Sequence, residues 1–313
     1  KNMFALGIVM YLFNRNITLL NGYFNTKFKN KPEVIKANQT VVAAGYSYAD
    51  TMEIFANTYR IEPANLAKGK YRDITGNVAT AWGLMAAAER SGRQIFCGSY
   101  PITPATDILA ELVKYKNLKV KAFQAEDEIA GICSSLGASF AGCLAVTTTS
   151  GPGLSLKSEA LGLAVMTELP LVVVDVQRGG PSTGLPTKSE QSDLMQALYG
   201  RNGDAPLIVL AARSSADCFY SAYEAAKLAM EHMTPVILLT EGALGNGSEI
   251  LRIPRVADLP AIVPPIAKAN DPEWQPYKRD EEKLNRQWAI PGTEGLRHRI
   301  SGLEKANGSG NLS

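Results

Sequence analysis

Four short segments of small and polar residues could carry chemistry, and each follows an apolar run that is typical of a strand. They are residues 100–107, 124–131, 147–155 and 176–188. The second contains Glu128, a carboxyl at the beginning of a helix that is almost uncharged through Cys143. Acidic residues are common in a first helical turn because the positive end of the helix dipole attracts them. We expect the helix over 126–141 to be buried nearly all round, in which case Glu128 needs a partner and is a candidate functional acid.

The first segment places Thr103 between two prolines, Pro101 and Pro104. Proline restricts its own φ, so this turn is rigid and could hold the threonine hydroxyl toward a ligand. Alternatively, the segment is only a strand-to-helix turn, in which Thr106 or Asp107 caps the following helix.

The third and fourth segments combine glycines with hydroxyl side chains. Residues 149–153 read Thr-Ser-Gly-Pro-Gly, which allows a ligand to approach the backbone closely. This loop lacks both the lysine of a P-loop and the GxGxxG spacing, so its ligand is not specified. Residues 176–188 include Arg178, which could form a bidentate pair with a carboxylate or a phosphate. The alternative is an ordinary surface arginine on a flexible loop.

The elements that position these segments alternate between strand and helix. Strands are expected near 94–98, 118–123, 144–148, 171–176, 207–211 and 236–240, and helices near 77–91, 106–115, 126–141, 154–168, 189–199 and 215–231. Runs such as 171–174 are continuously apolar, as parallel strands covered on both faces are. The alternation predicts an α/β fold with a doubly wound parallel sheet of about six strands. Ligands bind at the carboxyl ends of the strands in such a sheet, where all four segments fall.

The composition divides the chain into three parts. Residues 1–68 read as helical and irregular, residues 69–249 hold the alternating pattern, and residues 250–313 begin as a proline-rich linker. The sequence begins at Lys1 within an amphipathic helix and closes on a flexible stretch, so we expect it to be part of a longer chain or assembly.

Composition also argues against several classes of function. Lys and Arg total 32 against 30 Asp and Glu, so the charge gives no support for nucleic-acid binding. The longest apolar run, residues 3–13, is too short to cross a bilayer, and we expect no membrane partner. Four cysteines without CxxC spacing, together with two histidines, predict no metal site in this chain and favour a reduced, cytoplasmic protein.

Together, the motifs resemble the alpha subunit of 2-oxoacid:ferredoxin oxidoreductases, most closely of the 2-oxoglutarate type. The motifs are YPITPATD, QAEDEIAG, TTTSGPGLSLKSEALGLAVMTELPLVVVDVQRGGPSTGLPTK and YGRNGDAP. The resemblance implies that 69–249 is the pyrimidine-binding domain of a thiamine diphosphate enzyme. It also implies that 1–68 is the C-terminal part of a gamma-type domain with a linker, and that 250–313 leads to a further α/β domain.

The same resemblance implies roles in cofactor binding. Glu128 would hydrogen-bond the ring nitrogen N1′ of the aminopyrimidine, which favours the imino tautomer that removes the thiazolium C2 proton. Thr149, Ser150 and Gly151 would contact the same cofactor.

Substrate binding is implied for three further residues. Thr103 and Arg178 would bind the carboxylate of the 2-oxoacid, and Thr183 would lie near its carbonyl or its distal group. Lys188 is a candidate for contact with a second carboxylate.

The resemblance further implies the reaction and the partners. The reaction is the coenzyme A-dependent oxidative decarboxylation of 2-oxoglutarate to succinyl-CoA, with reduction of ferredoxin. This chain has no GDG motif followed by an asparagine and no cysteine ligands for a cluster. A beta subunit would therefore supply the Mg²⁺ site and the [4Fe-4S] cluster, and activity would require both subunits. A subunit acting on pyruvate or branched 2-oxoacids and a non-catalytic assembly subunit are the alternatives.

Overall fold

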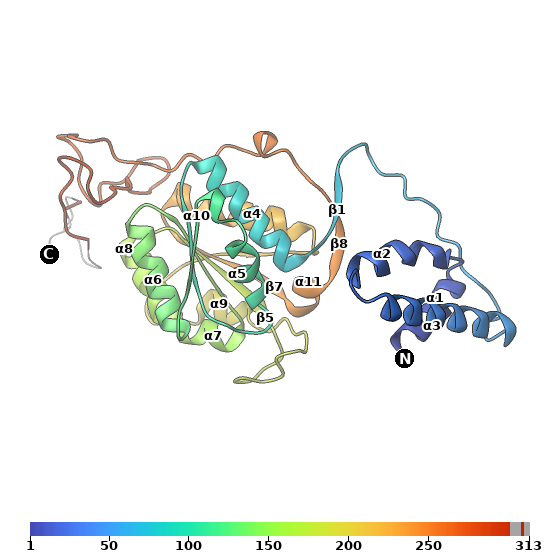
Figure 1. The fold of residues 1–313 in the computed structure, drawn as a ribbon. Coiled ribbons are helices and arrows are strands. Elements are labelled where there is room, and N and C mark those ends of the chain that lie inside the picture. Colours follow the sequence, from blue (N-terminus) through green and yellow to red (C-terminus); the bar gives the residue numbers. More distant parts are fainter. Residues whose placement is uncertain (301–307, 310–313) are drawn as a thin grey trace. The chain divides into compact units, whose positions relative to one another are not determined.

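The computed structural model describes residues 1–300 and 308–309 of the chain. The chain forms two compact units, one from Lys1 to Lys68 and one from Gly69 onward (Figure 1). The first unit is helical, and the strands of the described residues all belong to the second.

The first unit is a small helical assembly over residues 1–68. Its elements are α1 (Asn2–Leu12), the 3₁₀ turn Ile17–Leu19, α2 (Leu20–Lys27) and α3 (Pro32–Thr51). Pro32 takes the first position of α3, where its missing N–H removes no helical hydrogen bond. Helices α1 and α3 pack closely at Gly7 and Gly45, because a Cβ at Gly45 would overlap the backbone of Phe4. The helical character predicted for this segment is confirmed.

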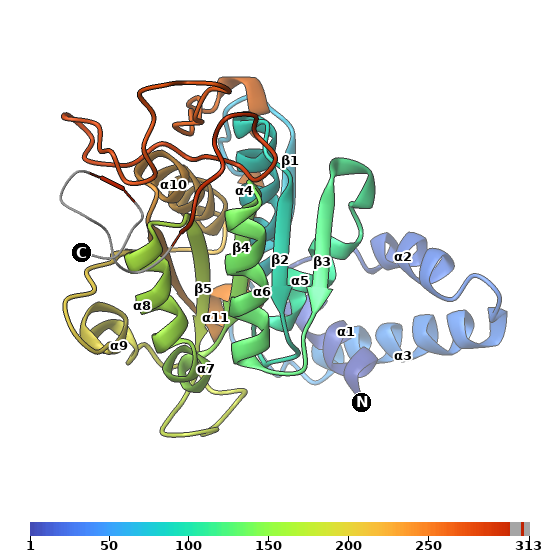
Figure 2. The ribbon, with the colours of Figure 1, turned by 90° about the vertical axis from the view of Figure 1, so that its left-hand side faces the viewer.

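The core of the second unit is a parallel sheet, which has six strands in the described part of the chain (Figure 2). The strand order is β3-β2-β4-β5-β7-β6. The strands are β2 (Ile95–Ser99), β3 (Val120–Gln124), β4 (Leu144–Thr149), β5 (Leu171–Gln177), β6 (Ile208–Ala211) and β7 (Pro235–Glu241). β4, β5 and β7 are buried along their whole length, which accounts for their continuous apolar runs. The predicted doubly wound sheet is therefore confirmed.

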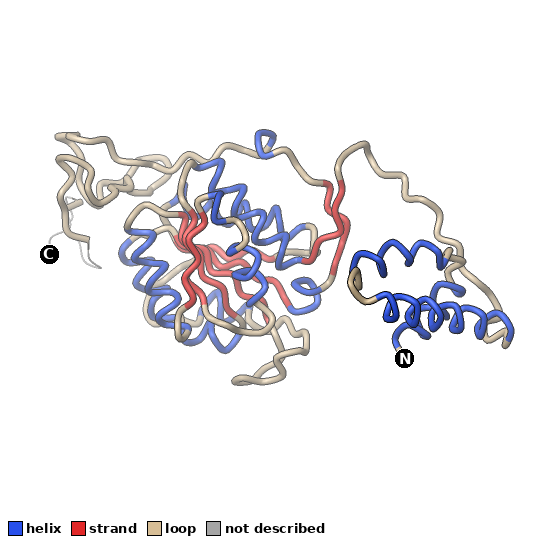
Figure 3. The backbone as a smooth tube through the Cα atoms, viewed as in Figure 1, coloured by secondary structure: helices blue, strands red, loops and turns tan. Residues whose placement is uncertain are grey.

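Helices cover both faces of this sheet (Figures 1 and 3). One face carries α4 (Gly76–Ser91), α5 (Thr106–Val113) and α10 (Asp217–His232), and the other carries α6 (Glu128–Phe140), α7 (Gly151–Leu156), α8 (Ser158–Thr167) and α9 (Leu194–Tyr199). Alternate residues of β5 join opposite cores: Val172 packs with the first set of helices and Val173 with the second. Each central strand is thus held on both sides by apolar contact.

The second unit also contains a two-stranded sheet that was not predicted from the sequence. β1 (Tyr71–Thr75) pairs antiparallel with β8 (Ser248–Arg252), and the short helix α11 (Gly242–Asn246) precedes β8. β8 includes residue 250, where the proline-rich linker was expected to begin. Most residues of both strands are not buried, so neither strand has the apolar run by which the other strands were recognised. After β8, residues 253–300 are irregular apart from the 3₁₀ turn Val256–Asp258, yet they bury Trp288 completely.

Helix α6 differs from its prediction. The expectation of burial nearly all round is wrong, because Ile129 is 53% exposed and Ala130, Cys133 and Gly137 are also exposed. The exposed stripe is itself apolar, so composition could not separate it from the buried stripe of Ile132 and Leu136. Two smaller differences concern helix bounds: the helix predicted over 154–168 is two helices, α7 and α8, and the one predicted from residue 189 begins at Leu194.

Candidate active site at the carboxyl edge of the sheet

The sheet has a topological switch point between β2 and β4. From β2 the chain moves outward to β3 and then returns to β4 on the other side of β2. Open α/β sheets bind their ligands at such a point, outside the carboxyl ends of the strands. Tyr100, directly after β2, and Thr149, the last residue of β4, meet there, with 2.9 Å between the Tyr100 Oη and the Thr149 Oγ1. The four segments singled out in the sequence follow β2, β3, β4 and β5, so all lie along this edge.

Arg178 joins two of these segments. Its Nη1 donates to the backbone oxygen of Thr103 over 2.7 Å, and its Nη2 donates to the backbone oxygen of Thr183 over 3.0 Å. The Arg178 residue is only 7% exposed, and its Nε has no hydrogen-bond partner among the described residues. The structure therefore brings together all three residues predicted to bind the substrate, through carbonyl groups rather than through the threonine hydroxyls.

The turn that carries Thr103 is held from two sides. Asn77 of α4 donates through Nδ2 to the backbone oxygen of Pro104 over 2.9 Å. Thr106 hydrogen-bonds the backbone of Ile102 through its Oγ1. The expectation that Thr106 or Asp107 caps α5 is wrong, since the capping position is Ala105 and no side chain makes the cap bond. Thr106 instead rigidifies the preceding turn, and Thr103 itself stays exposed.

Glu128 begins α6 and is half-buried. Its neighbour Asp127 supplies the cap, because Asp127 Oδ1 accepts the N–H of Ala130 over 2.8 Å. The Glu128 carboxylate lies beside the Tyr100 hydroxyl. Burial raises the pKa of Tyr100 well above its ordinary value, the contact with Glu128 raises that pKa further, and the charge of Arg178 acts in the opposite direction. Tyr100 thus contacts the predicted cofactor acid and feels the charge of the predicted substrate arginine.

Gly153 allows this close arrangement. A Cβ at Gly153 would overlap Thr149 Oγ1 and Tyr100 Oη, and it would lie 3.1 Å from Glu128 Cγ. Any side chain here would push apart the groups that converge on the switch point. The second glycine of the Thr-Ser-Gly-Pro-Gly loop is therefore required by packing within the chain.

Ser150 and Gly151 connect β4 to α7. Ser150 is fully buried, and its hydroxyl has no hydrogen-bond partner among the described residues. A Cβ at Gly151 would lie 2.8 Å from Asp193 Oδ2, so this carboxyl packs directly on the backbone of the turn. Asp193 interacts with Asp175, a fully buried carboxyl of β5, and burial together with the charge of Asp193 raises the pKa of Asp175. This turn thus rests on a pair of buried carboxyls.

The loop after β5 folds back on itself. The Gly179 N–H donates to the Lys188 backbone oxygen over 2.8 Å, and the Leu185 N–H donates to the Gly179 oxygen over 2.9 Å. Gly184 has a φ of +50°, and a Cβ there would overlap the Gly179 carbonyl. The side chains of Thr183 and Lys188 are exposed. They stand outside the buried part of the candidate site.

Four buried residues of this region were not anticipated as site residues: Tyr100, Lys157, Asp175 and Asp193. Two of them leave a signal in the sequence. Asp175 interrupts the apolar run of β5, and Lys157 follows a stretch from residue 129 to residue 156 that contains no charged residue. A charge in such a setting is rare unless it is paired or used.

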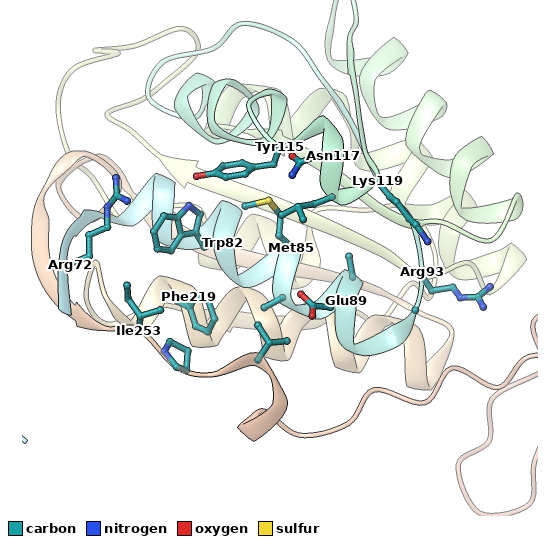
Figure 4. A pocket seen from close by; sticks show the side chains of 16 residues that line it. Arg72, Trp82, Met85, Glu89, Arg93, Tyr115, Asn117, Lys119, Phe219 and Ile253 are labelled. Atoms are coloured by element: carbon teal, nitrogen blue, oxygen red, sulfur yellow. The ribbon is translucent and has the colours of Figure 1, made fainter. Parts of the chain in front are cut away.

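A separate cavity of about 750 Å³ lies away from this edge (Figure 4). Arg93 and Asn117 line it, and they precede β2 and β3, so it adjoins the amino ends of these strands. Its apolar wall includes Trp82, Met85 and Phe219. None of the predicted site residues lines this cavity.

The described residues contain no group of three or more histidine, cysteine or acidic side chains arranged to hold a metal ion. Nor does any helix in this part of the chain have the length and hydropathy that a membrane crossing requires.

Comparison with known proteins places the chain among thiamine-dependent oxidoreductases. The family model of pyruvate flavodoxin/ferredoxin oxidoreductase, thiamine diphosphate-binding, matches residues 87–311. The 2-oxoglutarate oxidoreductase subunit KorA of Mycobacterium tuberculosis is 59% identical over 313 residues, which are 100% of this chain and 48% of that protein. The 2-oxoglutarate synthase subunit KorA of Archaeoglobus fulgidus is 44% identical over 190 residues, which are 59% of this chain and 53% of that protein. The chain thus spans about half the length of these curated relatives.

A solved structure supports the same relationship. The 2-oxoglutarate:ferredoxin oxidoreductase from Magnetococcus marinus, with 2-oxoglutarate, coenzyme A and succinyl-CoA bound, matches with a TM-score of 0.86 and 37% identity, covering 100% of this chain and 54% of that chain. The family match includes every strand-end segment of the candidate site. The chain belongs to the pyruvate flavodoxin/ferredoxin oxidoreductase family and carries its thiamine diphosphate-binding domain.

Proposed function

We propose that this chain binds the pyrimidine half of thiamine diphosphate and the 2-oxoacid in a 2-oxoglutarate:ferredoxin oxidoreductase. The observation that carries the proposal is that Glu128 lies beside the Tyr100 hydroxyl at the switch point of the sheet, along the same sheet edge where Arg178 holds the loops of Thr103 and Thr183. The complete enzyme would convert 2-oxoglutarate and coenzyme A to succinyl-CoA and CO₂, and the electron pair released would pass to ferredoxin. The names of the relatives from Mycobacterium tuberculosis and Magnetococcus marinus support 2-oxoglutarate as the substrate.

The residues around Glu128 fit an aminopyrimidine ring. Glu128 offers a half-buried carboxyl oxygen, which can hold or release a proton at ring nitrogen N1′. The Ser150 hydroxyl is buried without a partner among the described residues, and the following residue, Gly151, packs against the Asp193 carboxyl. When bound, thiamine diphosphate supplies a nucleophilic thiazolium carbon and an electron sink. The task of this chain would be to orient the ring and control the proton at N1′.

Arg178 fits the carboxylate of a 2-oxoacid. The guanidinium carries five N–H donors, and the two carbonyl contacts leave Nε without a partner among the described residues. A charge-assisted hydrogen bond to a carboxylate contributes about 1.5–3 kcal/mol and fixes the substrate carbonyl in one orientation. Thr103 and Thr183 are exposed, and their hydroxyls would contact the same substrate. Lys188, exposed at the loop base, is our candidate for the distal carboxylate of 2-oxoglutarate.

A partner subunit would complete the site. We propose that a beta subunit binds the Mg²⁺–diphosphate end of the cofactor and holds the [4Fe-4S] cluster that passes electrons to ferredoxin. The motifs for both functions are missing from this sequence, and the relative from Aeropyrum pernix is named as subunit alpha of a 2-oxoacid:ferredoxin oxidoreductase. We also propose a cytoplasmic location, because four cysteines without CxxC spacing favour a reduced protein.

The proposal is tested by a Glu128→Gln variant of the full-length chain, purified with its partner subunit. Glutamine keeps the size of the side chain but cannot exchange a proton with N1′, so we expect turnover to fall by at least about 100-fold. Glu159→Gln, an exposed change on α8, is the matched control. Near-normal turnover in Glu128→Gln would remove Glu128 from the reaction.

Substrate choice is tested separately with a panel of 2-oxoacids. We expect the purified complex to show the highest kcat/KM with 2-oxoglutarate. A preference for pyruvate or branched 2-oxoacids would change the assigned substrate but not the proposed reaction, an oxidative decarboxylation. Absence of bound thiamine diphosphate from the complex would favour a non-catalytic assembly subunit.

A further inference from the structure

Lys157 is a buried cation behind the beginning of α6. It lies between α7 and α8, is fully buried, and is the only lysine among the buried side chains of the described residues. Its Nζ donates to the backbone oxygen of Glu128 over 2.8 Å and to Thr147 Oγ1 over 3.2 Å. The same Nζ lies 5.1 Å from the ring centroid of Tyr100. One ammonium group thus ties together the start of α6, strand β4 and the loop after β2.

Lysine is a costly residue at this position. All three partners are neutral groups, and no ion pair of the described residues includes Lys157. Taking an ammonium out of water without a paired carboxylate is strongly unfavourable. A methionine would fill a similar volume without this cost. A lysine here therefore points to a use for its charge or for its hydrogen bonds.

Glu128 is held from two sides by this arrangement. Lys157 fixes its backbone oxygen, and Tyr100, whose ring packs on the ammonium, touches its carboxylate with the hydroxyl. Displacing Nζ would free the first turn of α6 and also remove the support of the Tyr100 ring. The position of the carboxyl is thus coupled to Lys157 through both the main chain and a side chain.

We propose that Lys157 is a positioning residue for Glu128, which fixes the first turn of α6 and supplies the positive charge that balances the Glu128 carboxylate. This inference rests on the proposed role of Glu128 in thiamine diphosphate binding. Lys157 does not touch the cofactor in this proposal, because its side chain is closed off from solvent. Its effect would be transmitted through Glu128.

The charge of Lys157 gives the proposal a pH signature. Burial lowers the pKa of Lys157 to about 8, and the charge of Glu128 is the largest effect that opposes this shift, followed by smaller effects of Cys97, Asp127 and Cys133. Above about pH 8 the amine is neutral and no longer balances the carboxylate. The affinity for thiamine diphosphate should therefore fall as the pH rises through this value.

The experiment compares Lys157→Met, Lys157→Gln and the control Lys227→Met in the full-length chain with its partner subunit. The dissociation constant of thiamine diphosphate, in the presence of Mg²⁺, is measured by calorimetry from about pH 6.5 to about pH 9.5. This range covers the pH at which a buried amine with a lowered pKa loses its proton. We expect Lys157→Met to weaken binding about tenfold at neutral pH, as the loss of a hydrogen bond to a charged donor does. Lys157→Gln keeps a donor, so it should lose less affinity. Both variants should lose the fall in affinity near pH 8.

The outcomes separate this inference from the proposed function. If the unaltered complex does not bind thiamine diphosphate, the proposed function fails. A second outcome would overturn the inference alone. In that outcome the unaltered complex binds thiamine diphosphate and Glu128→Gln weakens this binding, but Lys157→Met has the same affinity and pH profile as the unaltered complex. Should Lys157→Met not fold, the pH profile of Lys157→Gln decides, because a fall in affinity that persists near pH 8 contradicts the role of Lys157.

Discussion

The Arg178 guanidinium donates through Nη1 to the backbone oxygen of Thr103, 2.7 Å away, and so joins two loops that are 75 residues apart in the sequence. A peptide carbonyl holds the guanidinium in place without neutralising its charge. Arg178 therefore orders the edge of the sheet and keeps the positive charge that, in the proposed function, binds the substrate carboxylate. In the proposed function, one side chain would both hold the two loops together and bind the substrate. A substitution of Arg178 would therefore affect both tasks.

Arg178→Lys should weaken substrate binding although it keeps the charge. A single ammonium cannot reach two carbonyls and also pair with a carboxylate in a bidentate manner. We expect kcat/KM for 2-oxoglutarate to fall about 10–100-fold, mainly through KM, in steady-state assays of the complete enzyme. Arg213→Lys, at a side chain that is 88% exposed, should leave both constants unchanged. An unaltered KM in Arg178→Lys would exclude Arg178 from substrate binding.

Gly153→Ala should disrupt the cofactor site through a single added methyl group. That methyl would overlap Thr149 Oγ1 and Tyr100 Oη, so these groups must move apart and carry Glu128 with them. We expect a loss of thiamine diphosphate affinity and a destabilisation of about 1–3 kcal/mol, measured by calorimetry and by denaturant unfolding.

Gly162→Ala is the matched control for this change. Gly162 lies within α8, and a Cβ there meets nothing within 4 Å, so alanine should stabilise the helix by about 0.5–1 kcal/mol. Equal effects of the two substitutions on thiamine diphosphate affinity would contradict the packing argument for Gly153.

Much of the fold could be predicted from the sequence because it depends on local patterns. Short runs rich in apolar residues marked the six strands of the main sheet, although β3 includes Lys121 and is mostly exposed. The turn residues after these runs marked the carboxyl edge. The ribbon of β1 and β8 could not be found in this way. It pairs segments that lie far apart in sequence, and most of their residues are not buried.

The candidate site was predictable in its loops but not in its interior. Thr103, Arg178 and Thr183 come from two loops, and only the folded chain shows that carbonyl groups connect them. Lys157 and Asp175 lie in segments that pattern reading treats as core. The role of each residue depends on the buried groups that it contacts in the folded chain. Spacing along the sequence does not indicate these contacts.

Asp175→Asn should change how stability depends on pH. Burial and the charge of Asp193 raise the pKa of Asp175 above its ordinary value of 3.8, so the folded chain retains a proton that the unfolded chain releases. The resulting stability is complete below that ordinary value and is lost as the pH rises through the raised pKa. Asparagine removes the titration and keeps the shape, so the melting temperature of the variant should decline less between about pH 5 and about pH 8. If the melting temperatures of the unaltered protein and of Asp175→Asn declined equally over this pH range, Asp175 would not lose a proton there.

Ile129→Arg should impair assembly with the partner subunit and spare the fold. Ile129, Cys133 and Gly137 share one face of α6, and this face is exposed although it carries no charge. The stripe begins directly beside Glu128, whose cofactor would be completed by the partner, so we expect the beta subunit to cover it. Burying an isoleucine contributes about 1.5–3 kcal/mol, and an arginine there would also leave a buried charge, so the association constant should fall at least about tenfold. Val113→Arg, which changes a 42% exposed residue of α5 on the opposite face of the sheet, is the control. The two variants are compared by calorimetric titration with the purified partner, and equal affinities would place the partner contact elsewhere.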